Sequence, residues 1–525
     1  MLLKTSFRLR QAWPYLFMIG ILSFLFYGTG FDRNWSFWAD QELTLGYNGL
    51  LINSGLNQEY VDHPGFFSIQ LIALLMKLAN SLGLSHFQTI EGFNQSESLF
   101  DAMRYLVITA RHAALVTSIA LICGVYWFSK KISGQTSIAL LTAFLVFVSN
   151  GVFYHFTATR TEPIAFGFLL LSLYCFVRSF QAAPTRSQIP EPFTLLLAFI
   201  FFFCGALNKA QILVLAPFYF VWVSYFIQNP DQHSQQMTSA LPAWFYKILV
   251  PVSYLGLLYF YSLQSSGKGF LFNCALVTFF NGLILSIGIW QNGISGLKVR
   301  YQAISFLNIG YGLAYVLVEM LSRWINQGVS IFGNIADPMS MTRFLTGQSQ
   351  LLHAQSALIA SPSLTDKLAS ASVFLMSPLV ETFGKISAST LLIGFCVIWM
   401  YLKRDQLSKK ELWFGIYSFA SFYIVNLVNK TRYLDAPQYR IFSEFFLLGY
   451  ALLLIHPMPK RLQIKVLSGL IFLTILSNLV PYTNYYNWLI RKGSHPYCHS
   501  EVVHFHKLMD EKRISEECAK PGPEH

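Results

Sequence analysis

Two carboxylates stand close to the end of the first long apolar run of the sequence. The run begins near Trp13, and Trp38-Ala39-Asp40-Gln41-Glu42 follows it. A carboxylate beside a reacting hydroxyl or amine can act as a general base, and ionisable groups at a membrane boundary tend to be functional. Acidic residues also solvate easily in interfacial loops, so Asp40 and Glu42 by themselves leave both interpretations open.

A second polar step comes about twenty residues later and reads Tyr60-Val61-Asp62-His63-Pro64-Gly65. It opens the apolar segment Phe66–Leu84. His63 either binds an anionic group such as phosphate or caps the turn, and we favour the second role. A further acid, Glu162, stands in Thr159-Arg160-Thr161-Glu162-Pro163.

Three basic residues stand at the ends of other apolar runs, namely Arg160, Lys209 and Arg440. Arginine offers a planar fork and lysine a point charge to a phosphate, and such cations stabilise negative charge that develops during a reaction. The alternative is that each side chain extends to the lipid headgroups by snorkelling. All three fall on one predicted side of the membrane, where positive charge is otherwise sparse, and this favours a shared role.

The composition restricts what kind of protein positions these residues. Of 525 residues, 54% are hydrophobic and only 12% are charged, against roughly 25% charged in soluble domains. This excludes a cytosolic enzyme, a disordered protein and a disulfide-rich secreted domain. The apolar runs are continuous rather than alternating, which predicts membrane helices. The net charge of +12 is explained by the loop charges that orient such helices, so we expect no nucleic-acid partner.

The apolar runs predict an all-α polytopic membrane protein with about 13 transmembrane helices. The expected spans begin near Trp13, Leu106, Ser137, Ile164, Phe193, Ile212, Ile248, Phe270, Ala303, Ser389, Leu412, Tyr439 and Ile464. The run Phe66–Leu84 is ambiguous, because its length suits a span whereas Gln70, Lys77 and Asn80 suit an interfacial helix.

Loop charge decides between these two interpretations. If Met1 is cytoplasmic and Phe66–Leu84 does not cross, the loops rich in Lys and Arg fall inside, as the positive-inside rule requires. We therefore expect Phe66–Leu84 to lie at the outer interface. The prediction is a transmembrane domain over residues 1–481 with outer loops at 31–104 and 322–387. An outer tail over 482–525 would follow, in which Cys498 and Cys518 could pair.

The order of these motifs resembles the GT-C membrane glycosyltransferases. An acidic motif after the first span and a His-Pro step into an interfacial helix are similar to the protein O-mannosyltransferases and the bacterial aminoarabinose transferases, which use polyprenyl-phosphate donors. Those families read His-Pro-Pro or Lys-Pro-Pro where this chain reads Asp62-His63-Pro64-Gly65. The resemblance covers about the first 220 residues and the segment near Tyr439.

The resemblance also implies roles for individual residues. Asp40 would be the general base, with inversion at the anomeric carbon, and Glu42 would support it or bind the acceptor. Glu162 would orient the acceptor or hold a metal. The donor phosphate would be bound by basic residues, with Arg432 and Arg440 competing for one position; the full set is Arg160, Lys209, Arg440, Arg432 and His63, with Asp62 in the acceptor loop.

The implied function is an inverting transfer of a sugar from a polyprenyl-phosphate donor to an extracytoplasmic acceptor, which could be a lipid, a glycan or a protein. The location would be a bacterial inner membrane or the endoplasmic reticulum. A lipid-linked glycan polymerase or ligase, or a lipid-linked sugar transporter, are the alternatives. A transporter should carry ionisable groups near the middle of the bilayer, whereas here they gather at the ends of the runs. The sequence identifies no certain cofactor, and a divalent metal stays open.

Overall fold

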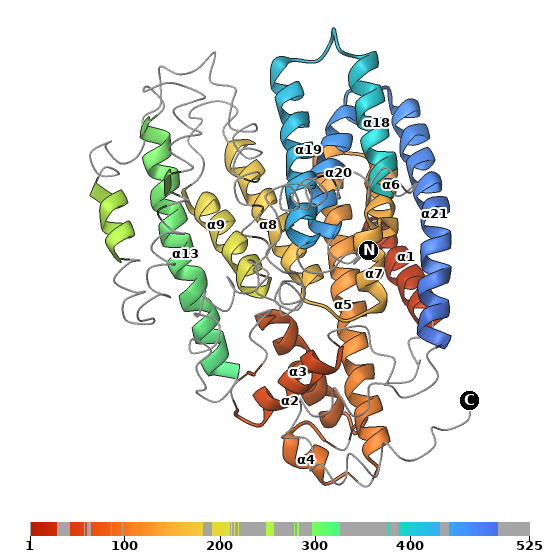
Figure 1. The fold of residues 1–525 in the computed structure, drawn as a ribbon, viewed down its shortest axis with the longest axis vertical. Helices are drawn as coiled ribbons and strands as arrows, with labels where there is room; N and C mark the ends of the chain where they lie inside the picture. The colour runs from red at the N-terminus through yellow and green to blue at the C-terminus, as the bar shows by residue number, and fades with distance from the viewer. Residues whose placement is uncertain are drawn as a thin grey trace, which may run out of the picture.

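The structure is a computed structural model whose regular elements, among the residues it describes, are α-helices (Figure 1). The described residues are 2–28, 42–56, 58–59, 65–85, 87–96, 98–181, 192–209, 212, 215, 219, 248–256, 278, 281–282, 297–325, 376, 388–430 and 440–491.

Helix α5 (Leu99–Ser133) is the longest element of the described chain. Its 35 residues give a length of about 52 Å, well beyond the ~30 Å hydrocarbon thickness of a bilayer. The Ser98 side chain caps its start by accepting a hydrogen bond from the Asp101 N–H at 3.2 Å. Gly134, with a φ of 67°, follows its end in the left-handed region. The helix is therefore long enough to cross a membrane and to project beyond it.

The projecting start of α5 carries a small helical layer made of α2 (Glu42–Asn53), α3 (Phe66–Ser81) and α4 (Ile90–Asn94). These helices share one buried apolar cluster with the first turns of α5. They form the lower end of the molecule in Figure 1, opposite the turn that joins α18 (Ala388–Leu402) to α19 (Lys409–Lys430). Helix α3 thus lies at the end of the bundle, and we expect it not to cross the membrane.

Helix α2 packs closely against α3 and against α5 because a glycine removes the side chain from each contact. A Cβ on Gly49 would lie 3.2 Å from Ile72 Cγ2 of α3, and one on Gly46 would lie 2.9 Å from Leu106 Cγ of α5. Just beyond α2, Ser54 Oγ accepts a hydrogen bond at 2.8 Å from the N–H of Ile90, which follows α3. The start of α2 is bonded to α5 through Glu42 and Arg111, and the start of α3 is bonded to the end of α9 through Gly65 and Asn208, so both N-termini face the bundle.

On one flank of the bundle, α8 (Glu162–Gln181) packs on α9 (Pro192–Asn208), and α9 packs on α13 (Leu297–Ile325). Aromatic rings fill both contacts: Phe176 lies 5.2 Å from Phe199, and Phe203 lies 4.2 Å from Tyr311 between ring centroids. Gly310 of α13 leaves room for Phe199. This flank carries the N-terminus of α8 and the C-terminus of α9 side by side.

On the other flank, α6 (Thr136–Val148) lies between α5 and α21 (Lys460–Arg491), and α7 (Asn150–Thr157) continues from α6 and also packs against α5. Asn478 of α21 donates a hydrogen bond to the Val148 carbonyl at 2.8 Å, where α6 ends. Helix α20 (Arg440–Ile455) packs against α18 and α19, and the Tyr450 ring covers Gly415. Helix α1 (Leu2–Gly28) lies against α5.

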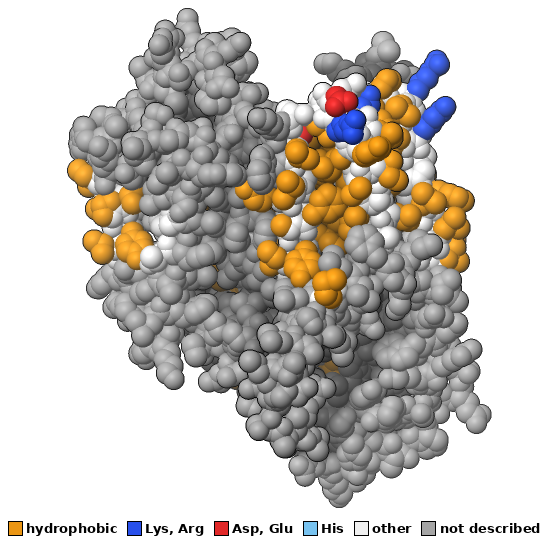
Figure 2. Space-filling view, turned by 45° about the horizontal axis from the view of Figure 1, so that its top comes forward, with side chains coloured by type: hydrophobic (Ala, Val, Ile, Leu, Met, Phe, Trp, Pro, Cys, Tyr) orange, Lys and Arg blue, Asp and Glu red, His pale blue; other side chains and the backbone are white. Residues whose placement is uncertain are grey.

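The bundle exposes an apolar surface, as expected of a protein surrounded by lipid. Large hydrophobic side chains stand out from several helices, for example Phe24 at 78% and Trp324 at 80% exposure. Figure 2 shows hydrophobic side chains over the described part of one face, with basic side chains gathered at one end of it. By length and composition, two of the described helical stretches could cross a membrane unaided, Asp101–Ser133 and Lys460–Leu479.

Several predicted features lie outside the described residues. They include most of the spans expected from Ile212, Ile248 and Phe270, nearly all of the outer loop 322–387, and Cys498 and Cys518 of the tail. The helix that contains the span expected from Leu106 begins earlier, at Leu99, because α5 continues into the layer formed by α2, α3 and α4.

Candidate active site

The first buried ion pair joins the acidic motif after α1 to the middle of α5. Glu42 is the first residue of α2, and its Oε2 accepts a hydrogen bond at 3.1 Å from Nε of Arg111. Both side chains have no exposed surface. The start of a helix favours a negative charge, so both the α2 N-terminus and Arg111 stabilise the Glu42 carboxylate.

Sequence reasoning missed Arg111, although a signal was present. Arg111 lies inside the apolar run that begins near Leu106, and a charged residue within such a run is usually conserved for a partner or a function. The partner, Glu42, is 69 positions away. Because the two residues are so far apart in the sequence, the position of one gives no indication of the other.

The second buried cluster brings three predicted site residues together. Glu162 Oε1 lies 2.7 Å from Lys209 Nζ and 3.3 Å from an Nη of Arg160, and all three side chains are fully buried. Arg160 Nε also donates to Glu162 Oε2 at 3.3 Å. Glu162 begins α8 and Pro163 follows it, a position that suits proline because the first helical N–H groups have no partner within the helix. Lys209 directly follows the end of α9.

Asn208 connects this cluster to the start of α3. Its side-chain N–H group donates to the Thr161 carbonyl at 2.6 Å and to Ser68 Oγ at 3.2 Å, and its Oδ1 accepts from the Ser68 N–H at 3.2 Å. The Asn208 carbonyl accepts from the N–H of Gly65 at 3.0 Å. The His63-Pro64-Gly65 step therefore ends beside Lys209.

Gly65 adopts the left-handed conformation that this entry into α3 needs, with a φ of 54°. As a result, the N-termini of α3 and α8 face the same region as Lys209 and Arg160. Helix N-termini and buried cations both favour an anionic ligand. The arrangement is suited to binding a phosphate.

Two residues of α2 hold Glu59, which lies between α2 and the start of α3. The Tyr47 hydroxyl donates to Glu59 Oε2 at 2.7 Å, and Asn48 Oδ1 accepts from the Glu59 N–H at 2.9 Å. Burial, reinforced by the hydrogen bond and the negative charge of Glu59, raises the pKa of the Tyr47 hydroxyl above its usual value. The Tyr47 hydroxyl therefore stays protonated over the physiological range and remains a hydrogen-bond donor to Glu59.

The side chains of the other predicted site residues lie outside the part of the chain that the structure describes. Asp40, Asp62, His63 and Arg432 lie outside the described residues. Arg440 begins α20, and its side chain is likewise not described. Their roles stay predictions.

The position of α20 is nevertheless known from its second turn. Phe445 packs edge-on against Phe166 of α8 with ring centroids 5.1 Å apart. Phe166 lies one helical turn after Glu162. Glu444, which precedes Phe445 in α20, is fully buried and accepts a hydrogen bond from Ser389 of α18 at 2.6 Å. The beginning of α20 therefore belongs to the same part of the bundle as the beginning of α8.

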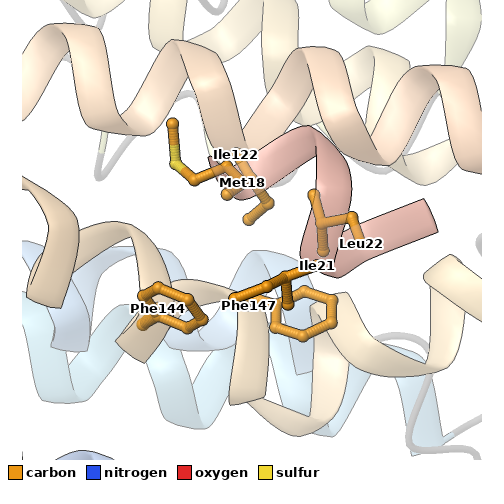
Figure 3. A pocket seen from close by; sticks show the side chains of 6 residues that line it. All are labelled: Met18, Ile21, Leu22, Ile122, Phe144 and Phe147. Atoms are coloured by element: carbon orange, nitrogen blue, oxygen red, sulfur yellow. The ribbon is translucent and has the colours of Figure 1, made fainter. Parts of the chain in front are cut away.

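Within the described part of the chain, no three His, Cys, Asp or Glu side chains are grouped as a metal site would require. A small apolar pocket of about 10 Å³ lies between α1, α5 and α6 (Figure 3). Its lining is entirely hydrophobic and consists of Met18, Ile21, Leu22, Ile122, Phe144 and Phe147. Because it offers no polar group, it cannot perform group-transfer chemistry.

Comparison with known proteins identifies one family model that matches this chain. The family model described as dolichyl-phosphate-mannose-protein mannosyltransferase matches residues 56–264. Searches of curated proteins and of solved structures found no match. The matched segment contains Arg111, Arg160, Glu162, Asn208 and Lys209, and Glu42 lies just before it.

The match confirms the resemblance seen in the motifs and the polytopic membrane character predicted from composition. Over residues 56–264 the chain is therefore similar to the dolichyl-phosphate-mannose-protein mannosyltransferases, and this match indicates a membrane glycosyltransferase that uses a lipid-phosphate sugar donor.

Proposed function

We propose that the chain is an inverting transferase that moves mannose from polyprenyl phosphate to a protein acceptor outside the cytoplasm. The observation that carries the proposal is the buried cluster of Glu162, Arg160 and Lys209 beside the start of α3, inside the matched segment. Mannose and the protein acceptor come from the description of the family.

In the reaction, an acceptor oxygen attacks the anomeric carbon of the sugar and loses its proton to a carboxylate base. The bond between that carbon and the phosphate oxygen breaks, and polyprenyl phosphate leaves with the bonding electrons. Attack from the face opposite the phosphate inverts the anomeric configuration. The protein must therefore supply a base on one side of the sugar and positive charge on the other.

Lys209 and Arg160 would stabilise the charge that develops on the leaving phosphate. Their burial supports this role, because an electrostatic interaction is stronger where water is excluded. The N-termini of α3 and α8 would add partial positive charge. Glu162 holds both basic side chains through its ion pairs, so we assign it the orientation of these cations in addition to the acceptor role implied by the resemblance.

Asp40 would be the base, two residues before Glu42 in the sequence. The buried pair of Glu42 and Arg111 supports this assignment, because it anchors the chain directly after Asp40 at the start of α2. With its carboxylate held by Arg111, Glu42 is better suited to support than to proton transfer.

The proposed topology has about 13 spans, a cytoplasmic N-terminus and an extracytoplasmic tail over 482–525. Support comes from the position of α2, α3 and α4 at the end of the bundle opposite Lys403 and Arg404 (Figure 1). Leu74 and Leu78 of α3, and Leu82 directly after it, form a line of exposed leucines at 60%, 52% and 63%. This line would contact the outer leaflet as an interfacial helix does.

The test is sugar transfer by the purified protein in liposomes, with polyprenyl-phosphate mannose as donor and a serine- and threonine-rich peptide as acceptor. Asp40→Asn is nearly isosteric but cannot accept a proton, so turnover should fall by about 10²–10⁴-fold while donor binding is kept. Glu42→Gln should lose less. Near-normal transfer by Asp40→Asn would remove Asp40 as the base.

A further inference from the structure

Asn208 connects three parts of the candidate site through its side chain. Its side chain bonds to Thr161, which directly precedes Glu162, and to both the N–H and the hydroxyl of Ser68 in α3. The side chain is fully buried. One residue therefore ties together the start of α8, the start of α3 and the end of α9.

The next residue along the chain is Lys209, whose backbone N–H bonds to the Gly205 carbonyl at 2.8 Å. Its Nζ lies 2.7 Å from Glu162. Lys209 and Glu162 are thus held to each other directly through their ion pair and a second time through Asn208 and Thr161. Two separate connections keep a buried lysine at a fixed distance from the start of α3, where a donor phosphate would lie.

We propose that Asn208 is a positioning residue that holds Lys209 and Glu162 against the start of α3, so that donor binding depends on it although it does not touch the donor. The inference rests on the proposed function. A misplacement of about 1 Å in a catalytic constellation can cost on the order of a hundredfold in rate, and an amide with this set of bonds limits such movement.

Asn208→Ala removes the three side-chain bonds while leaving the backbone bond from Gly65. We expect the donor kcat/KM to fall about ten- to a hundredfold, mainly through the donor KM, with the acceptor KM unchanged. Ser68→Ala removes only the hydroxyl partner and keeps the Ser68 N–H bond, so its effect should be smaller.

Ser172→Ala is the matched control. Ser172 of α8 donates to the Ala198 carbonyl of α9 at 2.6 Å, so it also joins these two helices through a buried hydrogen bond. It lies ten residues beyond Glu162, about 15 Å along the helix. It should lower thermal stability to a similar extent as Asn208→Ala and leave the donor kinetics unchanged.

The deciding experiment is a double-mutant cycle between Asn208→Ala and Lys209→Ala, read as donor kcat/KM in liposomes. If Asn208 acts through Lys209, the double variant should be less than about twofold worse than Lys209→Ala alone. Independent, multiplying losses would overturn the proposal, and so would unchanged donor kinetics in Asn208→Ala.

Asn208→Asp repeats the cycle should the alanine variant fail to accumulate in the membrane. Its protonated form can still donate to the Thr161 carbonyl, whereas its ionised form cannot. Relative to wild type, its activity should therefore rise as the pH falls, and a flat ratio contradicts the proposal. A wild-type protein that transfers no mannose would overturn the proposed function and this inference together, whereas an active wild type with multiplying losses overturns only the inference.

Discussion

Lys209 Nζ and Glu162 Oε1 lie 2.7 Å apart, and the side chains of both residues are fully buried. Arg160 contacts both oxygens of the same carboxylate, each at 3.3 Å. The contact joins the residue that follows α9 to the residue that begins α8. It brings together two residues that are 47 positions apart in the sequence.

Lys209→Ala should weaken use of the lipid donor. Loss of a charged phosphate contact costs about 1.5–3 kcal/mol, or roughly ten- to a hundredfold in donor kcat/KM. Lys131→Ala is the control, because Lys131 is exposed near the end of α5 and should leave transfer unchanged. The measurement is initial rate against donor concentration in liposomes. If Lys209→Ala matched the control, Lys209 would be assigned a structural role only.

Arg111→Ala should destabilise the fold strongly, because it leaves Glu42 buried without its partner. Breaking one side of a buried pair costs about 3–5 kcal/mol, which thermal unfolding in detergent would report as a large fall in Tm. Arg104→Ala, at an exposed position on the same helix, should change stability by no more than about 0.5 kcal/mol.

A double variant, Glu42→Gln with Arg111→Met, removes both charges of this pair. It should recover much of the stability lost in Arg111→Ala, because no buried charge is left uncompensated. Failure to recover stability would mean that other contacts of Arg111 carry its effect.

Gly310→Ala should loosen the contact between α9 and α13. A Cβ at this position would lie 2.6 Å from Phe199 Cβ and 3.3 Å from the Ile200 backbone nitrogen, so the helices would have to separate. Overpacking of this kind costs about 1–3 kcal/mol. Gly469→Ala in α21 meets no atom within 4 Å and should be neutral or stabilising by up to about 1 kcal/mol. Equal Tm values for the two variants would contradict this account of the packing.

Cysteine labelling tests the topology. A membrane-impermeant reagent added from outside should modify a cysteine at Gln95, beside α4, and should miss one at Asp405, between α18 and α19. Both positions are exposed, and the background should carry Cys498→Ser and Cys518→Ser. Gln58, which loop position alone would suggest as a target, is only 5% exposed and would react poorly. Labelling of Asp405→Cys from outside would reverse the proposed orientation.

Much of this protein follows from its sequence alone. Hydrophobic content and continuous apolar runs require a membrane-embedded helical bundle, because no soluble fold of this length can bury so much apolar surface. The order of the acidic motif, the His-Pro step and the outer basic residues was enough to indicate the enzyme family. The sequence motifs also indicate Glu42, Arg160, Glu162 and Lys209 as candidate site residues.

The tertiary structure decided which of these residues meet. Apolar periodicity determines that a segment is helical and which face is buried, but not the angle or height at which two helices pack. The pairing of Glu42 with Arg111 and the bonds from Asn208 to Ser68, 140 positions away, depend on those angles. Phe66–Leu84 had the length of a span, and it lies at the end of the bundle because the start of α5 continues past the other helices and offers α2 and α3 an apolar surface there.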